Sequence, residues 1–569
     1  MKKEIKMKKD TLFKLFIILL IATLFRVHML DKPEGLWNDE YLGWLIASKS
    51  TISDFIQQIF RNCHMPLYYI YLKLWIVLFG DSDLILRLSS VVPSLLSIIV
   101  MYFIGQEVKD EKLGLYTAAL CAISSFLIYF AQEMRLYSLI FLFSSLETLY
   151  FIKYAKEQSK KNITMFFVTN ALICMTHTLG IVFACFNIIL IYYYLYNTNE
   201  KYKKIIKNLA CFLKQIIPFF ITVIILLPLI FNIVFTPSLS QFWSEFNLLK
   251  ILFTFTDYFS PIQINILSPP LTFFDLIFYN HKLNIHFVFL AVLPTIIAIF
   301  AIISGILKKN KILNIALLSA SLFLISMVII ALTGKMILLT KYTIEVYPIL
   351  LTILAYGFTT MSKPKLKSIL IILYILINLS YLCFAKDAVQ NKTRPEGHYA
   401  PINLIENSKL KENDQVIFTF FDIDKFQKYI KSNDLKYTSI HKYNFPQIMF
   451  DRKNNDYLQL INEGKNTYQH YFKEFPNQII TKYIDENYIK NMKKGDRIGI
   501  VYLENISIYD NKTLQKIVDN SEQYEKSHFI YLCFSHLVNN ILYEFDNKLD
   551  FESMKKSGDW FLVTYKKVD

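Results

Sequence analysis

The chain has 569 residues, of which 54% are hydrophobic and 16% aromatic, and it carries a formal net charge of +15. A soluble core does not need so many apolar residues, so this composition excludes an ordinary soluble protein. The positive charge alone would suit a nucleic-acid partner. The lysines, however, gather in loops between apolar segments, which is typical of a membrane topology, so we expect no nucleic-acid partner.

Apolar segments of about 20 residues, the length needed to cross a hydrocarbon core of roughly 30 Å, recur through the first two thirds of the chain. We predict about eleven spans, of which the fifth and sixth are short and share one apolar run. The first run has no small-residue cleavage site after it, so it is expected to remain as an uncleaved helix. The predicted spans lie near residues 12–30, 84–107, 113–131, 136–154, 163–178, 179–196, 211–232, 285–307, 312–333, 343–361 and 368–385.

Lysines are concentrated in alternate loops between these spans, for example at residues 201–207. By the positive-inside rule these loops and the N-terminus face the cytoplasm, and an odd number of spans then places everything after about residue 386 outside. Residues 66–79 are apolar but too short to cross, and counting them as a span would place later lysine clusters outside. We therefore predict that they form an interfacial helix in the first outer loop.

The tail, residues 386–569, is a different kind of sequence. In it β-rich runs alternate with polar helical stretches, which predicts a small soluble α/β domain. It has no glycine-rich phosphate loop, so nothing in it indicates a nucleotide site. The expected architecture is a polytopic α-helical membrane domain over residues 1–385, with interfacial helices in its first outer loop, followed by an extracytoplasmic α/β domain. The β-rich runs are 415–421, 497–503, 529–534 and 560–565.

Two adjacent acids, Asp39 and Glu40, follow the first predicted span within residues 37–41. One interpretation is structural: Asn38 or Asp39 caps a helix over 40–48, since carboxylates are favoured near a helix N-terminus. The other is chemical: one carboxylate accepts a proton from an acceptor hydroxyl or amine. Neighbouring helical residues point about 100° apart, so one acid can face a substrate while the other holds the loop. Spacing alone leaves both interpretations open.

Further polar segments follow at the ends of the predicted spans, and together with the acid pair they carry a family resemblance. Their order and spacing over about residues 10–390 resemble the C-type membrane glycosyltransferases of the protein O-mannosyltransferase and aminoarabinose transferase superfamily, particularly bacterial members of glycosyltransferase family 39. Where many members have Arg-Tyr, this chain has Lys341-Tyr342, which keeps the charge but loses the bidentate phosphate geometry of arginine. The segments are His64 to Tyr69, Gly80 to Asp83, Arg87 to Ser90, Ala131 to Tyr137, Thr176 to Thr178, and Lys341-Tyr342.

The resemblance implies roles for individual residues. Asp39 takes the place of the catalytic base or acceptor ligand, and Glu40 that of its support. His64 stands where some relatives place a basic residue against the carrier phosphate, although histidine is a weaker cation than lysine at neutral pH. Arg135 and Lys341 are the further candidates for binding the donor phosphate.

Four more residues are expected to line or support the same cavity. Glu133 either contacts substrate or pairs with the nearby arginine to join two helix ends. Arg87 either supports the cavity or fixes the outer end of the second span. His177 either faces the cavity or is a core histidine in an apolar hairpin, and Tyr342 follows the candidate lysine.

The chemistry implied by the resemblance is transfer of a sugar from a polyprenyl-phosphate carrier to a lipid, glycan or protein acceptor at the outer face of the membrane. In an inverting displacement the carrier phosphate leaves with its negative charge, so the site needs cations at the phosphate and a base near the anomeric carbon. Membrane lipids surround the tail of the carrier. No cofactor is implied, no Cys/His spacing indicates zinc, and a requirement for a divalent metal stays open.

Other functions are compatible with a polytopic chain. A transporter would show inverted repeats and helices broken by Gly or Pro near mid-membrane, and few such breaks are present. A non-catalytic scaffold in cell-surface polysaccharide assembly would tolerate loss of Asp39, whereas an enzyme would not. A glycan polymerase or ligase would use lipid diphosphates, and the acid pair favours the monophosphate-sugar transferase.

The outer loop 233–284 is expected to shape specificity, and its candidate residues are Trp243, Glu245, Asp257 and Tyr258.

Overall fold

The computed structural model divides the chain into two compact units. The first comprises residues 1–30 and 42–391, and the second comprises residues 31–41 and 392–569. The short segment 31–41 therefore groups with the tail and not with the helices around it in sequence. The structure describes residues 8–28, 30–31, 35–60, 64–235, 248–261, 278–279, 282–283, 288–333, 338–384, 399–411, 414–418, 428–430, 435–439, 491–503, 542, 545, 548–557 and 560–568.

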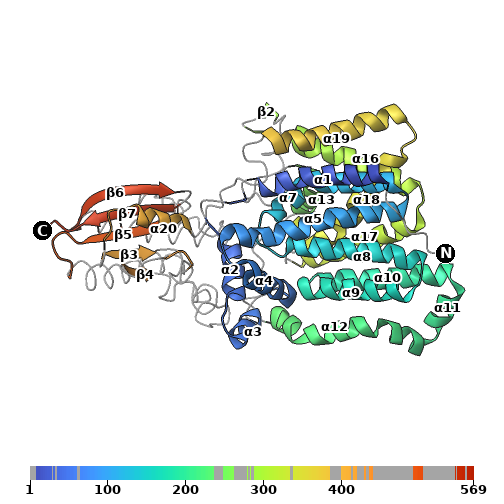
Figure 1. Cartoon of the computed structure of the whole chain (residues 1–569), viewed down its shortest axis with the longest axis horizontal. Helices are drawn as coiled ribbons and strands as arrows, with labels where there is room; N and C mark the ends of the chain where they lie inside the picture. The colour runs from blue at the N-terminus through green and yellow to red at the C-terminus, as the bar shows by residue number, and fades with distance from the viewer. Residues whose placement is uncertain are drawn as a thin grey trace, which may run out of the picture. The chain divides into compact units, whose positions relative to one another are not determined.

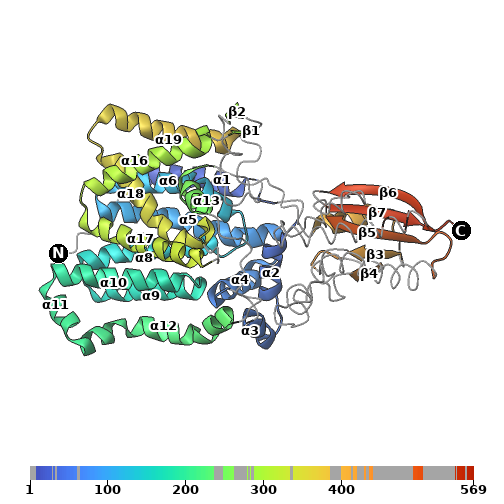
Figure 2. The same ribbon diagram turned by 180° about the vertical axis from the view of Figure 1, so that it is seen from behind.

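The first unit is a bundle of helices, and Figures 1 and 2 show its long members lying side by side. Large apolar side chains remain exposed on it, such as Ile225 in α12 and Ile296 in α16, as expected where lipid replaces water. Its elements are α1 (Lys9–Val27), α2 (Asn38–Ala47, which begins in the second unit), α3 (Ile52–Phe60), α4 (Pro66–Phe79), α5 (Asp83–Val108), α6 (Glu111–Ile123), α7 (Ser125–Ala131), α8 (Tyr137–Lys156), α9 (Lys160–Thr176), α10 (Gly180–Thr198), α11 (Glu200–Lys207), α12 (Leu209–Phe235), α13 (Leu248–Phe259), β1 (Phe278–Tyr279), β2 (Lys282–Leu283), η2 (Val288–Val292), α16 (Leu293–Leu307), α17 (Lys311–Leu332), η3 (Thr340–Val346), α18 (Tyr347–Thr360) and α19 (Pro364–Phe384).

Each predicted span overlaps helical structure in this unit, but the span 113–131 is divided between α6 and α7, and the span 343–361 begins in η3. Six helices among the described residues are long and apolar enough to cross a membrane, and the bent pair of α6 and α7 would make a seventh. The chain is thus a helical membrane protein, but this criterion does not reach the predicted total of about eleven spans. The predicted short apolar segment 66–79 forms α4, which has 14 residues.

Small residues bring pairs of helices into close contact in this bundle. A Cβ atom at Gly357 of α18 would lie 1.8 Å from the carbonyl oxygen of Ala301 on α16. One at Gly105 of α5 would lie 2.7 Å from the carbonyl oxygen of Leu113 on α6. Apolar side chains gain little over lipid tails, so this close backbone packing is a main source of helix association in membranes. It fixes the bundle whose helix ends carry the candidate site residues.

A buried arginine supports the bend of 59° between α6 and α7. Arg26 Nε donates to the hydroxyl of Ser94 at 2.8 Å. Its terminal nitrogens donate to the carbonyl oxygens of Ala122 at 3.0 Å and of Cys121 at 3.2 Å. These carbonyls lie at the end of α6, where the break removes their helical partners. Arg26 therefore stabilises the bend, and α7 leads from it into the segment 132–136.

The second unit contains a five-stranded sheet in the order β4-β3-β5-β7-β6. β3 pairs in parallel with β4 and β5, whereas β7 pairs antiparallel with β5 and β6. One helix, α20 (Tyr399–Glu406), packs against β6 and β7. The strands are β3 (Gln415–Phe418), β4 (Lys436–Ser439), β5 (Arg497–Leu503), β6 (Asp550–Ser557) and β7 (Trp560–Lys566).

The sheet confirms that the tail contains β structure. The run 497–503 forms β5, and the run 560–565 forms most of β7. Residues 415–418 of the run 415–421 form β3, which pairs with β4 and β5, and residues 419–421 lie outside the described residues. The run 529–534 lies outside the described residues. The division into a membrane domain and an outer domain at residue 386 stays a prediction.

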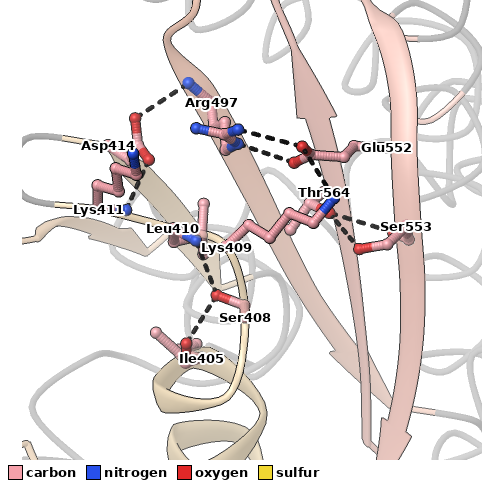
Figure 3. Close-up of polar contacts among 10 residues, drawn as sticks. All are labelled: Ile405, Ser408, Lys409, Leu410, Lys411, Asp414, Arg497, Glu552, Ser553 and Thr564. Carbon is pink, nitrogen blue, oxygen red and sulfur yellow. Dashed lines mark hydrogen bonds and ion pairs between the residues drawn. The ribbon is translucent and has the colours of Figure 1, made fainter.

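Polar pairs join parts of this sheet (Figure 3). Arg497 Nε and Nη2 donate to the two carboxylate oxygens of Glu552 at 2.8 Å and 3.2 Å, so a two-point ion pair links β5 to β6 across β7. This hydrogen bonding lowers the pKa of Glu552. Asp414, at the start of β3, accepts the backbone N–H of Arg497 at 3.0 Å and that of Lys411 at 2.7 Å. Charged contacts therefore stabilise the sheet as well as its apolar core.

Candidate active site

Four basic side chains from separate parts of the chain gather in the first unit. We call His64, Arg135, His177 and Lys341 the basic cluster. His64 Nε2 lies 3.3 Å from Arg135 Nη2. The charges of the other three residues all act on the His64 ring. The structure thus brings together the three predicted donor-phosphate residues and one predicted cavity residue.

His64 enters the basic cluster as a neutral ring. Loss of solvent around the ring, and then the positive charge of Arg135, hold the pKa of His64 well below the ordinary histidine value of 6.5. An arginine only donates hydrogen bonds, so Nε2 of His64 accepts, and the ring proton resides on Nδ1. His64 is therefore suited to donate one hydrogen bond, while Arg135 and Lys341 supply positive charge.

The segment that carries Glu133 and Arg135 is fixed by hydrogen bonds from two helices. The hydroxyl of Tyr68 in α4 donates at 2.8 Å to the carbonyl oxygen of the residue between them. Ser90 in α5 donates at 3.3 Å to the carbonyl oxygen of Arg135. The central guanidinium carbon of Arg135 also lies 5.9 Å from the ring centroid of Tyr137. Both Glu133 and Arg135 are buried, so the guanidinium presents its charge in a fixed direction.

His177 contacts a carboxylate that the sequence analysis did not select. Its Nδ1 contacts Oε1 of Glu345, and both side chains are buried. The other carboxylate oxygen of Glu345 has no hydrogen-bond partner within the described part of the chain. No local pattern points to this contact, because His177 and Glu345 are 168 positions apart in the sequence. Glu345 adds a negative charge beside the basic cluster and fixes the orientation of the His177 ring.

The side chain of Lys341 contacts the ring of its neighbour in the sequence, Tyr342. Its ammonium nitrogen is 5.0 Å from the centroid of the Tyr342 ring. The ring of His177 stacks on the same tyrosine, with 6.4 Å between the centroids and 28° between the planes. Tyr342 therefore supports two members of the basic cluster through the face of its ring.

Residues of the predicted specificity loop hold the segment η3, which carries the candidate lysine. The hydroxyl of Tyr258 in α13 donates to the carbonyl oxygen of Thr343 at 2.7 Å. Thr340 donates to Asp257 at 3.2 Å, and Asp257 and Tyr258 are both buried. This part of the loop therefore contacts the site from within the first unit. The loop candidates that lie outside the described residues are Trp243 and Glu245.

Arg87 is buried in α5, and its Nη1 donates to the carbonyl oxygen of Leu30 at 3.3 Å. Leu30 follows α1, so this contact joins the chain after one helix to the beginning of another. A contact of this kind is expected under the structural interpretation, in which Arg87 fixes the end of the second predicted span.

The acid pair opens α2 in the second unit, and its two carboxylates differ. Glu40 is buried and accepts the backbone N–H of Trp37 at 3.3 Å, which is one half of a capping box. Asp39 is partly exposed. Under the structural interpretation, Asn38 or Asp39 would cap a helix over 40–48. The helix instead begins at Asn38, and the capping contact comes from Glu40, because the third residue of a helix reaches back to the residue before it.

The side chain of Asn38 lies outside the described residues. In the ranges that the structure describes, no group of three or more His, Cys, Asp or Glu side chains is arranged to hold a metal ion.

Comparison with known protein families gives one match. Residues 63–228 match the family model described as dolichyl-phosphate-mannose-protein mannosyltransferase. This range contains His64, Arg135 and His177 of the basic cluster. A comparison with curated protein sequences finds no match.

Among solved structures, the chain is similar to ArnT from Cupriavidus metallidurans bound to undecaprenyl phosphate, at 10% identity and a TM-score of 0.50, with 97% of each chain covered. ArnT in its apo state matches at 9% identity and a TM-score of 0.48 over 97% of each chain. The oligosaccharyltransferase AglB from Archaeoglobus fulgidus, solved with an inhibitory peptide and a dolichol-phosphate, is 13% identical with a TM-score of 0.42. That match covers 75% of this chain and spans 64% of the AglB chain. The family match over residues 63–228 and the fold shared with ArnT confirm the predicted resemblance to the C-type membrane glycosyltransferases.

Proposed function

We propose that this chain transfers a sugar from a polyprenyl-phosphate carrier to an acceptor at the outer face of the membrane. The observation that carries the proposal is the basic cluster. Arg135 and Lys341 bring two positive charges to this cluster, and neutral His64 and the pair of His177 with Glu345 lie beside them. Such a group of donors is suited to bind an anion, and the leaving phosphate of a lipid carrier is the anion that we propose.

In the proposed reaction the basic cluster stabilises the leaving group. The bond between the anomeric carbon and the phosphate oxygen breaks, and the carrier leaves as polyprenyl phosphate with the bonding electrons. Arg135 and Lys341 neutralise the charge that develops on the phosphate, and neutral His64 adds a hydrogen bond. Preorganised donors of this kind act most strongly where water is excluded, which agrees with the burial of Arg135.

The acid pair is proposed to act on the acceptor. As the acceptor oxygen or nitrogen bonds to the anomeric carbon with inversion, its proton passes to the Asp39 carboxylate. Glu40 supports the loop. This division of roles is supported by the capping contact of buried Glu40 with Trp37, and by the partial exposure of Asp39.

The comparisons support the donor class. The name of the matched family includes dolichyl-phosphate mannose, and the similar ArnT structure holds undecaprenyl phosphate. Both molecules contain a polyprenyl phosphate, so we extend this donor class to the present chain. The sugar and the acceptor, whether lipid, glycan or protein, are not specified by these similarities.

We also propose about eleven spans, a cytoplasmic N-terminus and an extracytoplasmic tail, with the lysine-rich loops inside. Labelling of single cysteines with an impermeant reagent tests this topology in a chain whose native cysteines are replaced. A cysteine at Lys567 should react in intact cells, and one at Lys203 only after permeabilisation. The reverse pattern would overturn the orientation.

The reaction is tested with the full-length chain in vesicles that contain a polyprenyl-phosphate sugar, by measuring release of polyprenyl phosphate. Wild type should release it, and a double variant, Arg135→Ala with Lys341→Ala, should not. Use of a polyprenyl-diphosphate sugar alone would indicate a polymerase or ligase. Consumption of neither class of donor would contradict an enzymatic role and favour a scaffold.

A further inference from the structure

The segment just before the acid pair is held by residues from the C-terminal part of the chain. Leu36 is buried, and its backbone N–H donates to the hydroxyl oxygen of Tyr429 at 2.8 Å. The two residues are 393 positions apart in the sequence and belong to the same compact unit. The contact therefore comes from the tertiary structure of the second unit and not from the local helix start.

Gly35 shows how closely this segment is enclosed. Its φ angle is +77°, in the left-handed region that favours glycine. A Cβ atom at Gly35 would lie 2.7 Å from Cβ of Tyr399 and 2.8 Å from the hydroxyl oxygen of Tyr429. Real Cβ atoms do not approach other atoms so closely. Both the backbone angle and the packing therefore require glycine at this position.

The enclosing residues are anchored in the second unit. Tyr399 begins α20, the helix that packs against β6 and β7. The rings of Tyr399 and Tyr429 lie 5.5 Å apart between centroids and are inclined by 51°. We call Tyr399 and Tyr429 the tyrosine clamp. Because one member belongs to a helix packed on the sheet, the clamp connects the sheet to Gly35 and Leu36.

The clamp lies immediately before the candidate base. Trp37 follows Leu36 and donates its N–H to Glu40, and α2 begins with Asn38. Asp39 is therefore three residues after the amide that Tyr429 binds. The first residues of a helix lack intrahelical partners for their N–H groups and fray easily. Fixing the preceding backbone reduces the number of orientations that Asp39 can sample.

We infer that the C-terminal part of the second unit positions the Asp39 carboxylate. Tyr429 is the positioning residue, and it acts through Leu36 and the start of α2. This inference rests on the proposed function for the role of Asp39. A carboxylate that samples more orientations is aligned with its acceptor for less of the time, so loss of the clamp lowers turnover. Donor binding depends on the basic cluster and should not change, so KM for the donor stays constant.

The first test compares two tyrosine variants of the full-length chain. Tyr429→Phe removes only the hydroxyl that binds Leu36. Tyr565→Phe is the matched control, because Tyr565 is a buried tyrosine of the same unit whose hydroxyl donates to the carbonyl oxygen of Leu542 at 3.5 Å. Tyr429→Phe should lower turnover about two- to tenfold, the effect of one hydrogen bond, and should speed amide hydrogen exchange in residues 31–41. Tyr565→Phe should do neither.

Gly35→Ala supplies a second variant with a larger expected effect, because it forces the segment away from the clamp. Donor KM should stay at the wild-type value in Gly35→Ala and in Tyr429→Phe, while turnover falls. If amide exchange in residues 31–41 and turnover are unchanged in both variants, the inference is wrong.

The route through Asp39 is tested by adding Tyr429→Phe to an Asp39→Asn chain. Since the clamp acts through the carboxylate, the residual turnover of Asp39→Asn should not fall further. A further drop equal to that seen in wild type would show that Tyr429 acts elsewhere and would overturn the inference. Failure of the proposed function has a different signature: Asp39→Asn would then keep full activity, while the exchange effect of Tyr429→Phe would remain.

Discussion

The basic cluster and the acid pair are built in opposite ways. The cluster collects side chains from four separate regions of the sequence, and contacts such as that from Tyr68 to the Arg135 segment hold it together. The acids are neighbours in the chain at the start of one helix, where the helix dipole favours negative charge. Side chains from distant segments must be gathered by tertiary packing, whereas a carboxylate at a helix start is stabilised locally. We therefore expect substitutions in the basic cluster and in the acid pair to change activity by different amounts.

The largest effect is expected at Asp39. Asp39→Asn keeps the size of the side chain but removes the carboxylate, so turnover should fall by about 10²–10⁴-fold, the usual contribution of a general base. Folding and membrane insertion should be unchanged, as checked by a thermal melt of the purified chain. Glu40→Gln is the matched variant. If Glu40→Gln abolishes transfer while Asp39→Asn keeps nearly full activity, the base is misassigned by one residue.

The next effect tests whether the basic cluster needs charge at Lys341. Lys341→Ala should lower kcat/KM for the polyprenyl-phosphate donor by about 10²-fold, because it removes a cation from the leaving phosphate. Lys341→Arg keeps the charge and matches the Arg-Tyr motif of many relatives, so it should stay within about tenfold of wild type. Equal activity of the two variants would remove Lys341 from the site.

The contact between His177 and Glu345 is expected to matter less than Lys341. Glu345→Gln keeps the shape but removes the negative charge, and His177→Gln removes the ring. Each should lower kcat/KM about tenfold, the scale of one hydrogen bond to a charged group. The double variant should be no worse than the poorer single variant, because the two side chains act as one unit. Additive losses would mean that they act separately.

The smallest effect is expected at His64, and it concerns pH. Because its pKa lies well below 6.5, His64 stays neutral between pH 6 and pH 8, so His64→Gln should not change the shape of the activity profile there. Below pH 6.5 the unfolded chain binds this proton before the folded chain does, so stability falls on acidification. Thermal melts from pH 7.5 to pH 5 should therefore show a smaller loss for His64→Gln than for wild type. If wild-type activity instead changed between pH 6 and pH 8, and this change disappeared in His64→Gln, the His64 ring would be cationic in part of that range.

Several features of this protein follow from sequence alone. Long apolar runs favour membrane helices, so each predicted span overlaps helical structure. A composition rich in β-branched and aromatic residues likewise marks the strand over 497–503. The candidate site residues were selected by short motifs, because a motif records which side chains stand near one another along the chain. All of these features are read from residues close together in the sequence, so they require no knowledge of the folded structure.

Other features depend on contacts between distant residues. Glu345 became visible as a partner of His177 only through packing, since 168 residues separate them. The grouping of residues 31–41 with the tail, and the contact of Leu36 with Tyr429, likewise have no local signal. The neutral state of His64 depends on desolvation and on charges brought from other segments. Long-range packing sets distances and dielectric surroundings, and these quantities, which no local pattern contains, determine how the selected residues can act.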